Sequence, residues 1–159
     1  MKMGLITSIF ETLTLEQVID FAAETGLECL EVACWPSSGG AKRRYAGTCH
    51  IDAQALTKAR ADEINAYLAK KHVTISALAY YPNTLDPDLE KREAYIRHLR
   101  TLIDAAQLLG VGLVTTFLGR VPQWTVSRNL EEVKSVWPAI LDYAAEKGVR
   151  IAIENCPML

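Results

Sequence analysis

The 159-residue sequence predicts a single α/β domain in which parallel strands alternate with helices. Two observations lead to this prediction. Short apolar segments rich in Val, Ile, Leu and Thr are separated by longer stretches with helix start and stop signals. In addition, four similar joints connect a helix end to a strand start: AAETGLECLEV, LAKKHVTISAL, AQLLGVGLVTTF and AAEKGVRIAIE. Such a β/α series implies right-handed crossovers between neighbouring parallel strands.

The composition is that of a globular protein with a substantial core. Hydrophobic residues make up 50% of the chain and charged residues 23%, and the net charge is -2. This charge gives no general electrostatic reason to bind nucleic acid or an anionic membrane. No apolar run approaches the roughly 20 residues that a membrane span needs, and Glu11 interrupts the apolar N-terminus where a signal peptide would continue. The four cysteines have no CxxC spacing, so we expect reduced thiols in a cytoplasmic protein.

Five strands are predicted, at residues 4–10, 29–35, 73–81, 112–118 and 150–156. The first helix is expected to begin after Thr14, with Gln17 completing a capping box, and to end near Gly26. Asp52 is the predicted cap of the second helix, which runs to about Lys71.

The third and fourth helices have equally clear signals. Asp86 followed by proline predicts the start of the third helix, and Gly110 its end. Asn129 is the predicted cap of the fourth helix, which Gly148 ends. Pro138 is expected to kink or break that helix.

Two architectures share this element order. A doubly wound flavodoxin-like domain normally ends in a helix that covers its last strand, whereas a TIM barrel has eight β/α units in about 250 residues. Phe10-Glu11-Thr12 follows the first strand where a Gly-rich phosphate loop would lie, and too few residues follow the fifth strand for another helix. We therefore expect a TIM-barrel-type α/β fold over residues 1–159, an incomplete barrel of the first five strands and four helices.

In both architectures, functional side chains lie at the C-terminal ends of the strands. Alternation places Ile151 and Ile153 on one face, under the helices, and Ala152 and Glu154 on the other. In a barrel the second face points inward, so Glu154 needs a metal, a hydrogen-bonding ligand or a salt bridge from a neighbouring strand. Glu31 has the same parity in the second strand, where it either positions a substrate or is paired within the barrel.

Further candidates follow the strands. Trp35 opens a long loop to Ile51, and loops of that length are often functional. His50 is the most site-like histidine, because it lies close before the predicted second helix. Tyr80 and Phe117 are aromatic residues at strand ends, where such rings either shape a sugar pocket or cap the core.

The basic residues beside the strand ends leave similar alternatives open. Arg120 either pairs with an acidic or phosphorylated substrate or is a surface arginine. Lys42, Arg43 and Arg44 either meet a phosphate or are solvated. Cys49 is not expected to act as a nucleophile with the histidine that follows it, because adjacent residues rarely point at one another.

Several segments together resemble the sugar phosphate isomerase/epimerase group of xylose-isomerase-like TIM barrels. These are MKMGLITSIF, LECLEVACWP, RRYAGTCHID, ISALAYYPN, TTFLGR and above all GVRIAIENCPM. The resemblance implies a divalent metal (Mn, Mg, Co or Zn) at the barrel mouth, held by carboxylates and a histidine. The first ligand of that family is the glutamate ending strand five, which matches Glu154. The other ligands come from strands six to eight and are expected beyond residue 159.

The resemblance also implies a chemistry. A metal-dependent aldose–ketose isomerase or ketose epimerase polarises a carbonyl and hydroxyl pair while a carboxylate moves a proton through an enediolate. Two carboxylates are typical for this proton transfer; Glu154 is then one of them, acting on a small sugar or sugar phosphate, and the other is expected beyond residue 159. The candidate substrate-binding residues are Glu31, Trp35, His50, Tyr80, Phe117 and Arg120. Because open catalytic metal sites usually have three protein ligands, we expect the 159-residue chain alone to bind metal weakly and to be inactive.

Other functions are weighed against this one. The edges of the first and fifth strands invite a homo-oligomer or a completing half barrel. A non-catalytic flavodoxin-like or half-barrel domain, acting through a ligand or partner protein, is the main alternative. Related abasic-site endonucleases use several histidines at strand ends, but Tyr80-Tyr81 and Phe117-Leu118 end the third and fourth strands here. We therefore do not expect a nuclease.

Overall fold

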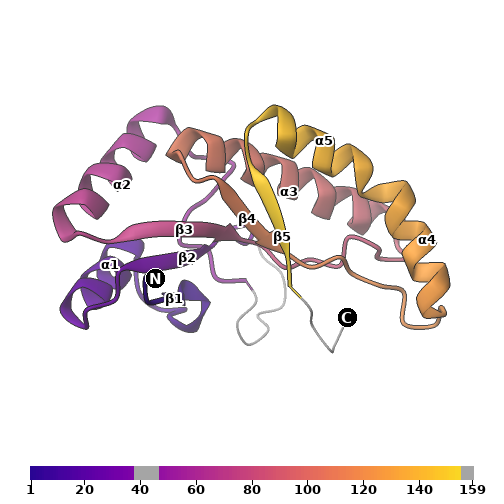
Figure 1. The fold of residues 1–159 in the computed structure, drawn as a ribbon, viewed down its shortest axis with the longest axis horizontal. Coiled ribbons are helices and arrows are strands. Elements are labelled where there is room, and N and C mark those ends of the chain that lie inside the picture. Colours follow the sequence, from indigo (N-terminus) through magenta and orange to yellow (C-terminus); the bar gives the residue numbers. More distant parts are fainter. Residues whose placement is uncertain (38–46, 155–159) are drawn as a thin grey trace.

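The computed structural model describes residues 1–37 and 47–154, and Figure 1 shows its fold. The strands are β1 (Gly4–Ile6), β2 (Cys29–Ala33), β3 (Thr74–Ala79), β4 (Leu113–Thr116) and β5 (Arg150–Ile153). The helices are α1 (Leu15–Glu24), α2 (Lys58–Lys71), α3 (Leu89–Leu109), α4 (Val126–Val136) and α5 (Pro138–Glu146), with a 3-10 turn, η1 (Thr7–Ile9), after β1. All five predicted strands are present, and within the described residues each strand is shorter than predicted.

The strand order identifies the architecture. The described strands form one parallel sheet in the order β1-β2-β3-β4-β5. A flavodoxin-like sheet has the order 2-1-3-4-5, because its chain reverses direction across the sheet after the first two strands. Sequential neighbours are the arrangement of a β/α barrel. The prediction of a TIM-barrel-type fold is therefore confirmed, and the flavodoxin-like alternative does not fit.

The core lies between the sheet and the helices. In Figure 1, α2, α3 and α5 lie along one side of the sheet. Leu30 and Val32 of β2, Leu78 of β3 and Val114 of β4 are fully buried beneath the helices. Burying each such side chain stabilises the fold by about 1.5–3 kcal/mol. No helix in residues 1–37 and 47–154 is long and apolar enough to cross a membrane.

The opposite face of the sheet carries smaller side chains. Ala33 of β2 alternates with Val32, and Ala77 and Ala79 alternate with Leu78 of β3. Thr115 has the same parity in β4. This inner face leaves room near the strand ends for Glu31 and its partners.

The first two helices begin at capping residues, of which only one was predicted correctly. Thr14 and Gln17 form the predicted capping box of α1. The prediction for α2 was wrong: Thr57 is its N-cap. Asp52 instead accepts hydrogen bonds from the amide of Gln54 at 3.0 Å and the hydroxyl of Ser37 at 2.7 Å, so it closes a turn ahead of the helix.

The later helices are also shifted at their starts. Asp88 rather than Asp86 is the N-cap of α3. Gly110 ends this helix as predicted, and its φ is 74°. The predicted fourth helix is divided at Pro138 into α4 and α5, so the described part of the chain has five α-helices instead of the predicted four. Thr125, not Asn129, is the N-cap of α4.

Asn129 has a different structural role from the predicted one. Its side-chain oxygen accepts a hydrogen bond from the amide of Val121 at 2.7 Å, and its amide group donates to the Val121 carbonyl at 3.2 Å. These two bonds fasten the loop after β4 to the first turn of α4. The loop that carries Arg120 is therefore held at its far end.

Candidate functional site

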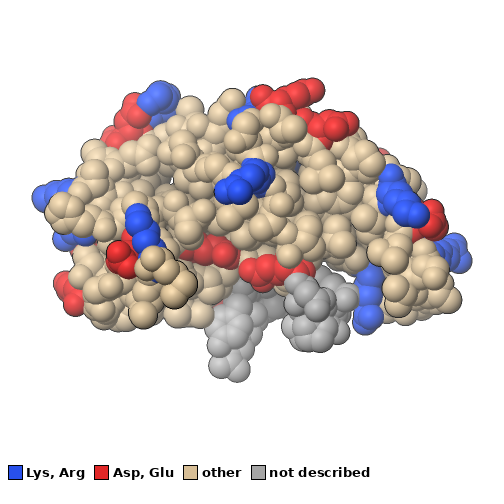
Figure 2. Space-filling view, viewed as in Figure 1, with Lys and Arg blue, Asp and Glu red and all other residues tan. Residues whose placement is uncertain are grey.

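A carboxylate cluster forms where the C-terminal ends of four strands meet. Glu31 comes from β2, Tyr81 follows β3, Thr115 lies in β4 and Glu154 follows β5. The Tyr81 hydroxyl donates to Glu31 and lies 2.7 Å from Oε1 of Glu154 and 3.1 Å from Oγ1 of Thr115. Figure 2 shows acidic side chains gathered in the lower middle of the molecule, beside the strand ends. One hydroxyl thus connects two carboxylates from distant strands.

Backbone pairing beyond the strands holds this cluster in place. The amide of Glu154 donates to the carbonyl of Thr116 at 2.9 Å, which extends the pairing of β5 with β4. The amide of Tyr80 donates to the carbonyl of Thr115 at 3.1 Å and does the same for β3. The site residues are therefore positioned by the sheet rather than by loops.

The electrostatics keep Tyr81 as a hydrogen-bond donor. Burial and its hydrogen bond to Glu31 raise the pKa of the Tyr81 hydroxyl well above its usual range. Burial also raises the pKa of Glu31; the charge of Glu154 adds to this effect, and the hydrogen bond from Tyr81 opposes it. A phenol carries a single proton and cannot donate to both carboxylates at once. The pair therefore has the capacity to accept a proton or bind a cation.

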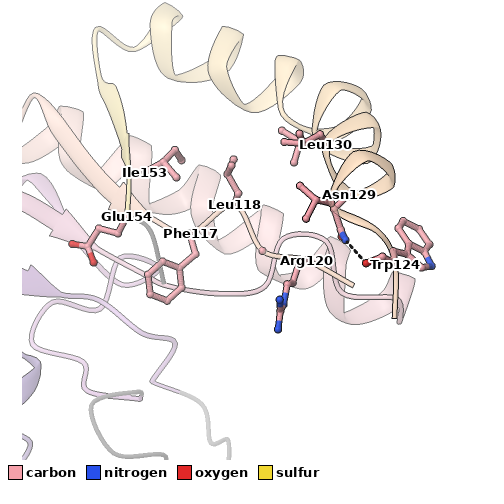
Figure 3. Close-up of a pocket in the computed structure, with 11 residues that line it drawn as sticks. Phe117, Leu118, Arg120, Trp124, Asn129, Leu130, Ile153 and Glu154 are labelled. Carbon is pink, nitrogen blue, oxygen red and sulfur yellow. Dashed lines mark hydrogen bonds between the residues drawn. The ribbon is translucent and has the colours of Figure 1, made fainter. Parts of the chain in front are cut away.

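An open groove of about 520 Å³ lies beside the cluster, between β5 and α4. Figure 3 shows Ile153 and Leu130 facing this groove, whereas Glu154 points away from Leu130. Residues Ile153 and Leu130 are 43% and 50% exposed. The prediction that helices cover Ile153 was therefore wrong, because α4 stands apart from this end of β5. The groove gives the carboxylate site an apolar flank.

Phe117 and Arg120 are brought to the mouth of the site. The ring of Phe117 packs against that of Tyr81, with centroids 4.6 Å apart. The side-chain oxygen of Asn83 accepts a hydrogen bond from the amide of Arg120 at 2.8 Å, and its amide group donates to the Arg120 carbonyl at 2.9 Å. The guanidinium of Arg120 is exposed and extends away from the loop (Figure 3). Asn83 was not predicted as a residue that supports the site.

The structure does not bring Tyr80 to the cluster. Tyr80 is 1% exposed and lies in the core on the helix side of the sheet. Its ring packs edge-on against Trp35 at 5.0 Å and against His98 at 4.6 Å. Tyr80, a predicted substrate-binding residue, therefore lies in the core and not at the cluster; Tyr81, which was not among the predicted site residues, lies there instead.

His50 and Trp35 lie on the β2 side of the mouth. The His50 ring contacts the carbonyl of Leu13 through Nε2 at 3.2 Å. Burial lowers the pKa of His50, so the ring is neutral at neutral pH and Nε2 donates to Leu13. The part-buried Trp35 packs against Tyr80. Neither ring has a hydrogen bond to the carboxylate cluster, and Lys42, Arg43 and Arg44 lie outside the described residues.

The family of the chain follows from its sequence. A family model described as the xylose isomerase-like TIM barrel matches residues 19–159. The chain belongs to the xylose isomerase-like TIM barrel family. A comparison with curated proteins gave no significant match.

Solved structures share the fold of this xylose isomerase-like chain. The probable 3-DHS dehydratase AsbF of petrobactin synthesis from Bacillus anthracis superposes with TM-score 0.70 at 20% identity, covering 99% of this chain and 53% of its own. A D-tagatose 3-epimerase-like protein superposes with TM-score 0.70 at 20% identity, and the match covers 99% of this chain and 54% of that protein. The zinc-bound IOLI protein superposes with TM-score 0.68 at 18% identity, and the match covers 96% of this chain and 51% of that protein. The chain therefore spans about half the length of these proteins, and the likeness shows the fold.

The family raises the question of a metal. Carboxylate oxygens are suitable ligands for Mg, Mn and Zn, and Glu154 is exposed at the strand end where a ligand would be needed. Within residues 1–37 and 47–154, however, no group of three or more His, Cys, Asp or Glu side chains lies close enough to hold a metal ion. The described residues at this strand end supply the two carboxylates Glu154 and Glu31, which is fewer than the three protein ligands of a usual catalytic metal site.

Proposed function

We propose that this chain carries the catalytic carboxylate of a metal-dependent cytoplasmic isomerase or epimerase for a small sugar or sugar phosphate. The observation that carries the proposal is the position of Glu154. It is an exposed carboxylate at the end of β5, its backbone amide donates to the carbonyl of Thr116, and its Oε1 lies 2.7 Å from the Tyr81 hydroxyl. Family membership and the barrel-type strand order support the same conclusion.

In the proposed reaction Glu154 removes a proton from the carbon next to a carbonyl. The resulting enediolate then takes up a proton at the neighbouring carbon in an isomerase, or, from a second group on the opposite face, at the same carbon in an epimerase. The chemistry that a bound divalent metal supplies is polarisation of the carbonyl oxygen and the adjacent hydroxyl. The hydroxyl of Tyr81 lies 2.7 Å from Oε1 of Glu154, so the other carboxylate oxygen is the one proposed to face the metal and the substrate. The second proton-transferring group is proposed to lie outside residues 1–37 and 47–154.

The substrate is proposed to lie against Phe117, whose ring is part-buried beside Tyr81. Arg120 is the group suited to a phosphate or carboxylate on the substrate, because its backbone is fixed and its guanidinium is exposed. Glu31 acts through Tyr81. His50 and Trp35 enter the proposal as supports of the mouth, since their rings contact neighbouring protein groups.

Metal binding tests the role of Glu154 on the 159-residue chain itself. Titration with Mn²⁺, followed by electron paramagnetic resonance of the unbound ion, is expected to show weak binding. Glu154→Gln should remove it, because the amide is a poorer ligand of the same shape. Glu93, exposed on α3, provides the matched control, and Glu93→Gln should bind as the wild type does. Equal Mn²⁺ binding by Glu154→Gln and the wild type would contradict the assignment.

Turnover tests the reaction class. In D₂O, the complete natural protein that contains this sequence should exchange the proton next to the carbonyl of a ketose or ketose phosphate, as seen by NMR. Glu154→Gln should slow this exchange at least about 100-fold. The 159-residue chain alone is expected to show no turnover. Exchange at the wild-type rate in Glu154→Gln would exclude Glu154 as the base.

The alternative is a half barrel that works only with another chain. It is favoured by one observation: β1 and β5 are the two edges of the described sheet, and unpaired edge strands are templates for pairing. Light scattering during size-exclusion chromatography distinguishes the two. A stable dimer of the 159-residue chain supports the half-barrel alternative, and a stable monomer with no self-association opposes it.

A further inference from the structure

Cys34 and Cys49 lie opposite each other across a short antiparallel bridge that follows β2. Backbone hydrogen bonds lie on either side of the pair: Trp35 N to Thr48 O at 3.2 Å and His50 N to Ala33 O at 2.9 Å. The two cysteines are therefore the non-hydrogen-bonded pair of the bridge. In such pairs the Cα atoms are about 4.5 Å apart and the side chains are closer together than in hydrogen-bonded pairs.

This arrangement meets the backbone requirement for a disulfide, which is a Cα separation of about 4.4–6.8 Å with both side chains on one side. We infer that Cys34 and Cys49 are an oxidisable dithiol that forms an intramolecular disulfide when exposed to a low-molecular-weight disulfide. Both thiols are unpaired in the structure. Cys29 is the third described cysteine, and its sulfur lies against the backbone of Gly4 instead.

The surroundings of the two thiols set the order of the reaction. Cys34 is fully buried and its thiol donates to the carbonyl of Val32 at 3.3 Å. Cys49 is part-exposed, and burial together with the charge of Asp52 raises its pKa to about 11. Burial raises the pKa of Cys34 further, and the charge of Cys49 adds to this, as expected for sulfurs close in space. Cys49 is therefore the thiol that reacts first, and it reacts slowly because little of it is ionised.

The chemistry balances with oxidised glutathione as the oxidant. The Cys49 thiolate attacks one sulfur of glutathione disulfide, forms a mixed disulfide and releases one glutathione thiolate. Cys34, as its thiolate, then attacks the Cys49 sulfur and releases the second glutathione. The two protons lost by the cysteines end on the two glutathione thiols. The protein loses two electrons, and glutathione disulfide gains them.

The disulfide would connect the end of β2 to the residue before His50. The carbonyl of Cys34 already accepts a hydrogen bond from Nε2 of the buried His98 at 2.8 Å. Oxidation therefore adds a covalent link between Cys34 and Cys49, and the end of β2 can keep its position against His98. The strand end that carries Glu31 is then held by a covalent bond as well as by hydrogen bonds.

The test is oxidation of the 159-residue chain with glutathione disulfide, followed by peptide mapping under non-reducing conditions. Trypsin cleaves after Lys42 and Arg44, between the two cysteines, and glutamyl endopeptidase cleaves after Glu31, between Cys29 and Cys34. We expect peptide 32–42 linked to peptide 45–58, with a mass two hydrogens lower than the sum of the free peptides. Reduction with dithiothreitol should separate them.

Variants make the result specific. Cys29→Ser should leave the linked pair unchanged, and Cys49→Ser should abolish it and leave Cys34 as a free thiol. Cys49 is the better position to change because it is part-exposed, whereas a change at the buried Cys34 disturbs the core. Recovery of Cys49 only as its glutathione mixed disulfide, or of a link between other cysteines in its place, would overturn the inference.

Discussion

The hydroxyl oxygen of Tyr81 lies 2.7 Å from Oε1 of Glu154, although 73 residues separate them in the sequence. The same hydroxyl donates to Glu31 and lies 3.1 Å from the hydroxyl of Thr115. One phenol oxygen therefore sets the spacing of two carboxylates that come from β2 and β5. The catalytic proposal depends on this spacing, because it determines which oxygen of Glu154 is left for a substrate.

Removing that hydroxyl should destabilise the fold without disturbing its packing. We expect Tyr81→Phe to lower the free energy of unfolding by roughly 1–3 kcal/mol, since Glu31 loses its donor and the hydroxyl between the two carboxylates is removed while the ring contact with Phe117 is kept. Urea denaturation measures the change. Tyr95→Phe is the matched control, because no hydrogen bond of the Tyr95 hydroxyl is found within the described residues, and it should change stability by less than about 0.5 kcal/mol. Equal effects of the two substitutions would contradict the role given to Tyr81.

The ionisation of Glu31 should cost stability at neutral pH. Burial raises its folded-state pKa, so the folded chain binds this proton more tightly than the unfolded chain does. The contribution of Glu31 to the free energy of unfolding is fully present below its pKa in the unfolded chain. It is lost as the pH rises through its pKa in the folded chain. Glu31→Gln should therefore be more stable than the wild type at neutral pH, and the difference should vanish below about pH 4.

A series of urea denaturation midpoints at different pH values measures this difference. Glu93→Gln, at an exposed position on α3, is the control and should follow the wild type at every pH. A stability difference between Glu31→Gln and the wild type that stayed constant with pH would show that ionisation of Glu31 is not its cause.

Alternation along the strands was enough to predict the inner position of the carboxylates. Leu30 and Val32 are buried under the helices and Glu31 lies on the other face, as a simple two-residue period requires. The capping box of Thr14 and Gln17 was equally predictable, because all of its contacts lie within one turn of helix. Local rules succeed where the interacting groups are neighbours in sequence.

The position of Tyr81 could not be predicted this way, because β3 contains an irregularity. Leu30 pairs with Ile75, but Glu31 pairs with Ala77, so one residue of β3 is passed over. Ile75 and Leu78 both pack on the helix side as a result. A strict alternation counted from Ile75 places Tyr80 on the inner face, and the bulge reverses this. Where a bulge falls depends on the partner strand, which the local sequence does not specify.

The starts of the helices were misplaced for a related reason. Asp86 and Asp88 are both good caps, and the choice between them depends on the loop before α3. Asp86 accepts the amide of Asp88 at 2.9 Å and so closes the preceding turn, while Asp88 accepts the amide of Glu90 at 3.1 Å. Asp86 therefore stabilises the turn, and Asp88 is the residue that caps the helix.

The loop that presents Arg120 should tolerate no side chain at Gly119. A Cβ there would lie 2.2 Å from the side-chain oxygen of Asn83 and 2.8 Å from the amide of Thr84, at a φ of +78°. We expect Gly119→Ala to cost at least about 2 kcal/mol, because the clash adds to the backbone strain. Gly148→Ala, at φ +69° with no atom within 4 Å, carries the strain alone and should cost about 1 kcal/mol. Thermal or urea unfolding that ranked the two variants equally would disprove the close packing at Gly119.

The position of α4, which forms one wall of the groove, should depend on Arg92 of α3. Its guanidinium pairs with Glu132 of α4, and its Nε and Nη2 donate to the carbonyls of Asp86 at 2.9 Å and Leu85 at 3.3 Å. Only 12% of the Arg92 side chain is exposed, so these bonds are poorly replaced by water.

Arg92→Lys keeps the charge but not the fork of donors, and we expect it to lower the free energy of unfolding by roughly 1–3 kcal/mol. Faster amide hydrogen exchange in α4 should accompany it, whereas Arg97→Lys, at an exposed position of α3, should leave both measurements unchanged. Wild-type exchange rates in α4 of Arg92→Lys would show that other contacts hold this wall of the groove.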